Sequence, residues 1–316
     1  MKLVRAVLLR LLYGALSLLF ISLITFAAAE MAPGDAARMI AGEKATPDAI
    51  ARVRTELGMD RPAPERFARF VVGAVQLDFG NSFYGTREPV IDTLKRALPM
   101  TMRIAGWAIL VAAIVGIGLG ALAAIWEGRW LDKLVLTLST FGVTIPNFVL
   151  APILILIFAL KLDMLPINWT EERVASDFYY LVLPVLVLSL RPMATLTRLT
   201  RASMIDVLNQ DFIRLAIAKG VPKFRLYTRH ALRNAIFPSV TALGTSFGFL
   251  LTGSFIVETA FTLPGIGRLA IESIQKRDIP MIQATTLVAG FLFVFVNLLV
   301  DLVLPLLDPR IRESQV

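Results

Sequence analysis

The sequence contains no cysteine and a single histidine, His230. A chain without cysteine can form neither a disulfide nor a thiolate metal site, and one histidine excludes a metal centre built from several imidazoles. Charged residues are also scarce, at 18% of the chain against 56% hydrophobic residues. These proportions are typical of a polytopic membrane protein and not of a soluble globule. We therefore predict an all-α polytopic membrane protein.

The chain also lacks the motifs of common nucleotide-using enzymes. No Gly-x-x-x-x-Gly-Lys-Ser/Thr loop is present to cradle phosphates, so the chain cannot hydrolyse ATP by itself. Asp78-Phe79-Gly80 matches a kinase tripeptide, but neither a glycine-rich loop nor a catalytic loop accompanies it. An intramembrane enzyme would need a catalytic cluster, which His230 alone does not supply. We expect no catalytic residue, no metal and no cofactor on this chain.

Six apolar runs approach the roughly 20 helical residues that cross a hydrocarbon core of about 30 Å. The first run is longer than the h-region of a cleaved signal peptide, which is the alternative interpretation. The six membrane helices are predicted at about residues 11–29, 103–125, 134–160, 178–197, 236–257 and 282–306.

The segments between these runs complete the predicted organisation. A short helix is expected after Thr46-Pro47-Asp48, closed by Gly58, inside a long polar region. The predicted parts are a cytoplasmic N-terminus with the first span (1–30), an extracytoplasmic region (31–100), a transmembrane core (101–306) and a cytoplasmic tail (307–316). The core has outer loops at 161–177 and 258–281 and a cytoplasmic loop at 198–235.

The net charge of +8 would in another context suggest nucleic acid. Here the excess Lys and Arg lie in loops between apolar runs, so membrane topology explains them and no nucleic-acid partner is expected. The N-terminus, residues 127–133, residues 198–233 and the tail share one side and carry this excess, whereas the other side is balanced. The positive-inside rule then places both termini in the cytoplasm.

Glycine and proline mark two of the spans. Gly116, Gly118 and Gly120 include a Gly-x-x-x-Gly spacing, which permits close contact between helices in lipid. Pro146 and Pro152 fall inside the third run and predict a kinked helix.

The loop between the fourth and fifth runs contains a basic helical segment that is interrupted by glycine. Asp211 favours a helix N-terminus, and Phe212, Leu215 and Ala216 recur on one helical face. Gly220 ends this helix and Pro222 restarts the chain in a new direction. A short exposed helix between membrane spans suits the groove of another protein. The alternative is a solvated basic loop that merely obeys the positive-inside rule.

The same segment resembles a known motif. Arg214-Leu215-Ala216 followed by Gly220 is similar to a degenerate Glu-Ala-Ala-x-x-x-Gly loop of bacterial ABC importer permeases, with Arg in place of Glu and Leu in place of Ala. Ile236-Phe237-Pro238 resembles the end of that motif, at the longer spacing of the peptide/nickel branch. The resemblance also rests on residues 144–148, 252–259, 263–267, 297–301 and 308–312.

Over essentially its whole length the chain thus resembles a B-type oligopeptide or dipeptide permease. The resemblance implies a type I ABC importer fold in the bacterial inner membrane, transporting peptides by alternating access. It implies a C-type second permease subunit, two ATPase subunits that carry ATP and Mg, and an extracytoplasmic substrate-binding protein. Nickel, glutathione or glycopeptide cargo is left open, as is a secondary transporter or channel. The implied coupling residues are Arg214, Leu215, Ala216, Ala218, Lys219, Gly220 and Pro222.

Charged residues in or beside the apolar runs are candidates for the translocation path. Arg191 is expected to lie roughly 10 Å inside the cytoplasmic boundary, and Asp301 at a similar depth. We predict that they pair in one state and that Arg191 can meet a peptide carboxylate in another. The alternative is that Arg191 snorkels to the headgroups. Glu258, which follows the fifth run, is a further hypothetical residue of the path.

Overall fold

The computed structural model describes residues 2–31, 36–42, 45–56, 58–85, 87–170 and 176–307. Regular structure in these ranges is helical, apart from one isolated bridge between Asn81 and Pro89. Four helices are long and apolar enough to cross a membrane, or up to six if each of two bent helix pairs counts as one span. The chain forms two compact units, residues 3–99 with 265–292 and residues 100–264 with 293 onward.

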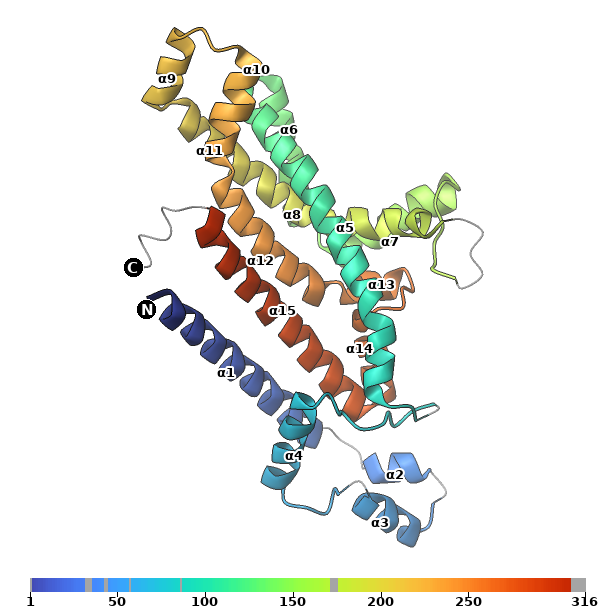
Figure 1. Ribbon diagram of the computed structural model, residues 1–316. Helices are drawn as coiled ribbons and strands as arrows, with labels where there is room; N and C mark the ends of the chain where they lie inside the picture. The colour runs from blue at the N-terminus through green and yellow to red at the C-terminus, as the bar shows by residue number, and fades with distance from the viewer. Residues whose placement is uncertain are drawn as a thin grey trace. The chain divides into compact units, whose positions relative to one another are not determined.

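The first unit contains the predicted extracytoplasmic region (Figure 1). The predicted short helix is confirmed, and Gly58 follows it with a left-handed φ of 65°. Its elements are α1 (Lys2–Met31), α2 (Ala36–Ala41), α3 (Pro47–Glu56), α4 (Ala63–Val75), the start of α5 (Val90–Ile125), α14 (Ile266–Lys276) and the start of α15 (Ile279–Leu307).

Aromatic and aliphatic contacts hold this unit together. The Phe26 ring of α1 lies 5.4 Å from the Phe67 ring of α4. Val90 of α5 and Met281 of α15 are buried in one cluster with their neighbours. Asp278, between α14 and α15, accepts hydrogen bonds from the Ser82 hydroxyl and, at 3.1 Å, from the Phe83 N–H. This buried carboxylate therefore fixes residues 82–83 against the turn that precedes α15.

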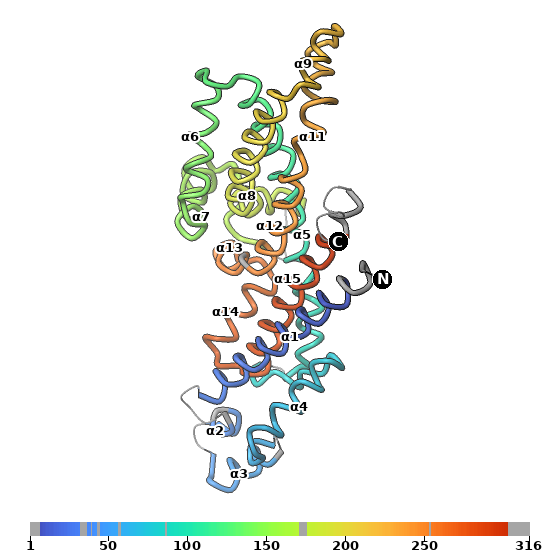
Figure 2. The backbone as a smooth tube through the Cα atoms, turned by 90° about the vertical axis from the view of Figure 1, so that its left-hand side faces the viewer, coloured from blue at the N-terminus to red at the C-terminus, as the bar shows by residue number. Residues whose placement is uncertain are grey.

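The second unit is arranged around α8 (Asp177–Leu208), which contacts α6, α7, α11, α12 and α13. Figures 1 and 2 show α8 between α6 and α12. The other elements of the unit are the rest of α5, α6 (Trp130–Thr144), α7 (Asn147–Leu154), the π-helical η1 (Ile155–Lys161), α9 (Asp211–Ala218), α10 (Lys223–Arg225), the π-helical η2 (Leu226–Leu232), α11 (Arg233–Ala235), α12 (Phe237–Gly253), α13 (Phe255–Ala260) and the rest of α15.

Two of the three closely spaced glycines let α5 approach the backbone of α8. A Cβ added to Gly116 would lie 2.7 Å from the Met193 carbonyl oxygen, and one added to Gly120 would lie 2.5 Å from the Thr197 carbonyl oxygen. A Cβ on Gly118 would meet nothing within 4 Å. The predicted close packing is therefore confirmed for the Gly-x-x-x-Gly pair.

Two predicted spans are strongly bent. The third run is a pair of helices, α6 and α7–η1, that meet at 106° around Ile145-Pro146, and not a kinked continuous helix. Pro146 has no N–H to donate and disfavours helical geometry in Ile145, so α6 ends there. The fifth run begins as α12, and the chain bends by 55° between the preceding segment α10–η2–α11 and α12. Pro238 lies in the first turn of α12.

Other predicted boundaries need correction. Residues 258–281 were expected as an outer loop, but they include the end of α13 and the whole of α14. The turn signal at Pro264-Gly265 hid a helix whose Ile266, Ala270 and Ser273 recur on one buried face. The second helix begins at Val90 and the fourth continues to Leu208, so both extend beyond their apolar runs. The tail motif at residues 308–312 lies outside the described residues.

Candidate functional site

The predicted coupling segment is a separate short helix with defined ends. It begins at Asp211 and ends at Ala218, as α9. Gly220 follows with a left-handed φ of 74°, and Pro222 precedes α10. The start at Asp211 and the stop at Gly220 were both predicted from sequence and are confirmed.

The helix α9 has one buried and one exposed face. Ile213 and Ala216 are buried in a cluster with Leu226 of η2. Leu215 and Ile217 are 56% and 58% exposed. The predicted face of Phe212, Leu215 and Ala216 is thus divided, because Ala216 packs inside the loop. The small side chain of Ala216 serves that internal packing, and Leu215 belongs to the apolar surface that is open to a partner.

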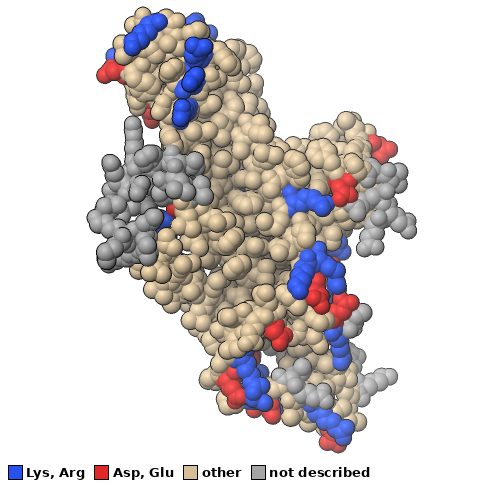
Figure 3. Space-filling view, viewed as in Figure 1, with Lys and Arg blue, Asp and Glu red and all other residues tan. Residues whose placement is uncertain are grey.

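This apolar surface is bordered by positive charge. Phe224 of α10 is 80% exposed. Figure 3 shows Lys and Arg over the α9–α11 end of the second unit, with few acids. The positive-inside rule assigns such a surface to the cytoplasmic side. The exposed basic residues here are Arg214, Lys219, Lys223, Arg225, Arg229 and Arg233.

A buried ion pair joins α6 to α8 in the same unit. Arg201 Nε lies 2.5 Å from Asp132 Oδ1 and Arg201 Nη2 lies 2.7 Å from Asp132 Oδ2. The Gly128 N–H donates a third hydrogen bond to Asp132, at 2.9 Å. Asp132 is 2% exposed. Two parallel bonds from one guanidinium give a fixed relative orientation of the two helices.

Arg191 lies near the middle of α8 and lines a pocket of about 410 Å³. The pocket is walled by α7, α8 and α12. Its polar lining residues are Asn147, Arg191, Thr195, Thr245 and Ser246, and its apolar ones are Leu188, Pro192, Ala242, Phe249 and Leu250.

The other two candidates for the path lie elsewhere. Glu258 is fully buried and accepts hydrogen bonds from Thr101, at 2.9 Å, and Ser254, at 2.6 Å. In this conformation it exposes no surface to a cavity and joins α5 to α13, so its place on the path stays a prediction. Asp301 is half-buried in α15 and does not line the Arg191 pocket, so the pairing of Arg191 with Asp301 also stays a prediction.

Sequence reasoning missed the polar neighbours of Arg191. Thr195 lies one helical turn after Arg191, and Thr245-Ser246 interrupts the fifth run. A search for polar residues at i and i+4 within an apolar run would have found the first of these. Only the fold brings Asn147 and Ser246, which are distant in sequence, to the same pocket.

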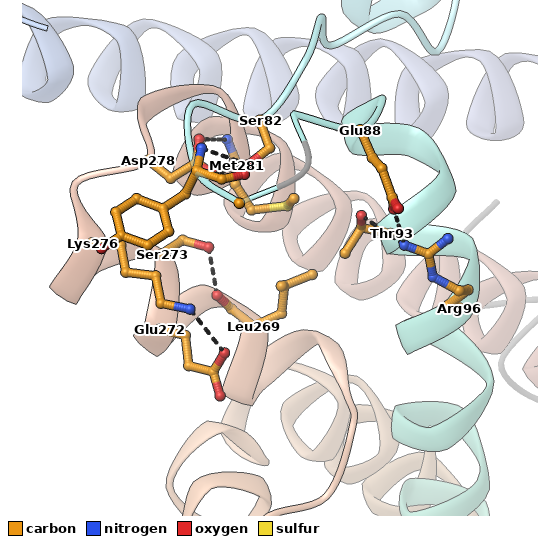
Figure 4. Close-up of a pocket in the computed structure, with 12 residues that line it drawn as sticks. Ser82, Glu88, Thr93, Arg96, Leu269, Glu272, Ser273, Lys276, Asp278 and Met281 are labelled. Carbon is orange, nitrogen blue, oxygen red and sulfur yellow. Dashed lines mark hydrogen bonds and ion pairs between the residues drawn. The ribbon is translucent and has the colours of Figure 1, made fainter. Parts of the chain in front are cut away.

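The first unit holds a different, charged pocket of about 370 Å³ (Figure 4). Both of its cations are paired within the pocket wall: Arg96 contacts Glu88, and Lys276 lies 3.8 Å from Glu272. The Lys276 ammonium also lies 5.4 Å from the centre of the Tyr84 ring. Because each of these cations already faces a carboxylate, this pocket selects no single charge.

The apolar helices, the polar pocket among them and the exposed helix α9 with basic residues around it are features of a multi-pass membrane protein. The chain matches the family model "Binding-protein-dependent transport system inner membrane component" over residues 116–313 and the N-terminal model of the same system over residues 3–105. It belongs to this family of ABC transporter permeases, and it is a bacterial inner-membrane protein.

Two relatives carry the same printed name. Glutathione transport system permease protein GsiC of Escherichia coli (strain K12) is 39% identical over 302 residues, which are 95% of this chain and 97% of the relative. The protein of that name from Shigella flexneri serotype 5b is also 39% identical, over the same shares of both chains. The similarity therefore extends over nearly all of both chains.

Proposed function

We propose that this chain forms, with a second permease subunit, the translocation path for small peptides, with glutathione as a member of that cargo class. The observation that carries the proposal is the near full-length similarity to permeases named for glutathione transport. The chain's own motifs, which resemble those of dipeptide and oligopeptide permeases, point to the same branch. Nickel and glycopeptides are the competing cargoes. Uptake of labelled glutathione, a dipeptide and nickel by cells with and without this gene tests the proposal, and loss of nickel uptake alone would contradict it.

ATP and Mg belong, in this proposal, to two partner ATPase subunits. Their closure moves α9, and α9 transmits the movement to the helices that line the path. Coupling of this kind needs a rigid element that both sites influence. The packing of Ile213 and Ala216 against η2 makes α9 such an element.

Leu215→Asp is expected to reduce recovery of the ATPase subunits at least about tenfold, because a charge would be placed in an apolar docking surface. Leu215 is 56% exposed, so the subunit itself should still fold and insert. Co-purification of the ATPases with the tagged permease measures the effect. Val75→Asp is the matched control, since Val75 is 81% exposed on α4 and outside the docking surface. Equal ATPase recovery in both variants would remove α9 from the interface.

The absence of cysteine allows the binding-protein contact to be mapped with single cysteines. We expect Arg52→Cys on α3 and Arg69→Cys on α4, carrying a bifunctional crosslinker, to capture the substrate-binding protein, because both positions are exposed in the predicted extracytoplasmic region. Lys219→Cys, directly after α9, is the control and should capture an ATPase subunit. Capture of cytoplasmic proteins from Arg52 would overturn the predicted topology.

A further inference from the structure

The Arg191 pocket has the composition of an anion site. Arg191 is its only charged lining residue among those the structure describes. The other polar lining groups are one amide and three hydroxyls. A pocket facing lipid would leave the Arg191 guanidinium and the Asn147 amide in hydrocarbon, which is costly, so water or a polar ligand is the expected occupant.

Three of these side chains have hydrogen-bond donors to spare. No described residue pairs with the guanidinium of Arg191, the amide of Asn147 or the hydroxyl of Ser246. By contrast, Thr195 and Thr245 donate their hydroxyl hydrogens to carbonyl oxygens of their own helices, both at 3.1 Å. A carboxylate accepts hydrogen bonds and donates none, so it matches the free groups.

The bend in the third run adds to this arrangement. Asn147 is the first residue of α7, so the N-terminal end of that helix lies at the pocket wall. A helix N-terminus carries partial positive charge and favours anions. α6 packs along α8, with Gly142 beside Leu190 and Ala194, so the helix end that follows α6 also lies against α8.

We propose that Arg191, Asn147 and Ser246 form a carboxylate-binding subsite within the translocation path, which takes the free carboxylate of a passing peptide. The subsite rests on the proposed function for its cargo, but its anion preference is a property of this chain alone. Arg191 is its anchor, because a guanidinium can bind both oxygens of one carboxylate. Asn147 and Ser246 orient the bound group.

The anion preference is tested without any cargo. Ser246→Cys gives the cysteine-free chain one thiol at the pocket, in the assembled complex in membranes. The rate at which this thiol is modified is measured with two methanethiosulfonate reagents, one bearing a sulfonate and one bearing a trimethylammonium group. Each rate is divided by the rate of the same reagent with a free thiol. We expect about tenfold faster labelling by the anion, from the field of one nearby charge. Adding Arg191→Met should abolish this preference, and adding Arg191→Lys should retain most of it.

Arg198→Met is the matched control, because Arg198 is an exposed arginine of α8 that does not line the pocket. It should leave the preference unchanged. Failure of both reagents to react, as for a thiol facing lipid, would overturn the subsite. An equal rate for the two reagents, as expected if a carboxylate of a second subunit neutralises Arg191, would also overturn it. A preference for the anionic reagent that survives Arg191→Met would overturn it as well.

Transport then tests the role in the path. Arg191→Met should lower glutathione uptake about tenfold, as expected for loss of a charge-assisted bond, while Arg198→Met should not. If the unsubstituted complex imports neither glutathione nor dipeptides, the proposed function fails, and the labelling ratio still decides the subsite. If it imports them and Arg191→Met imports them equally well, the subsite lies off the path and the inference is wrong.

Discussion

Gly120→Leu is expected to abolish accumulation of folded permease in the membrane. A Cβ at this position would lie 2.5 Å from the Thr197 carbonyl oxygen and 2.8 Å from Thr200 Cβ. These contacts are with the backbone and the base of a side chain of α8, which cannot rotate away. Even Gly120→Ala should cost about 2 kcal/mol, within the range measured for overpacked cores. Thermal unfolding of the purified subunit in detergent measures this cost.

Gly118→Ala is the matched control. It lies in the same turn of α5, but its added Cβ would meet nothing within 4 Å. We expect this variant to be as stable as the parent or slightly more stable, because alanine is favoured over glycine in a helix by roughly 0.5–1 kcal/mol. Equal stability of Gly118→Ala and Gly120→Ala would mean that α5 does not approach α8 as described.

Asp132→Ala is expected to destabilise the second unit by about 3 kcal/mol, since it leaves the Arg201 charge without its partner in a largely buried site. The side chain of Arg201 is 22% exposed, so water offsets only part of the loss. The melting temperature of the purified subunit measures this effect as well.

The double variant Asp132→Ala/Arg201→Ala separates the pair from the lone charge. It should be more stable than Asp132→Ala alone, because the uncompensated charge is then gone. Glu127→Ala, a change of an exposed acid beside this pair, should shift the melting temperature little. A double variant whose loss of stability equals the sum of the losses in Asp132→Ala and Arg201→Ala would show that the two residues act separately.

Local sequence chemistry determined the membrane class, most of the helices and the limits of α9. Apolar runs of membrane length must become helices, because no water is present to bind their backbone groups. Asp211 and Gly220 act on the neighbouring backbone, and their effects as helix start and stop are visible without the fold. The family resemblance rested on the order and spacing of several motifs, which are also properties of the sequence alone.

The tertiary structure decided which side of each helix faces inward and which distant residues meet. Sequence periodicity placed Ala216 on the same face as Leu215, but packing against η2 buries Ala216 and leaves Leu215 exposed. The size of the bend at Pro146 depends on what α7 packs against, so the prolines predicted a kink but not 106°. Packing of α6 and α12 against α8 brings Asn147 and Ser246 to the pocket that Arg191 lines. The pocket arises because three segments from different parts of the chain pack around one arginine.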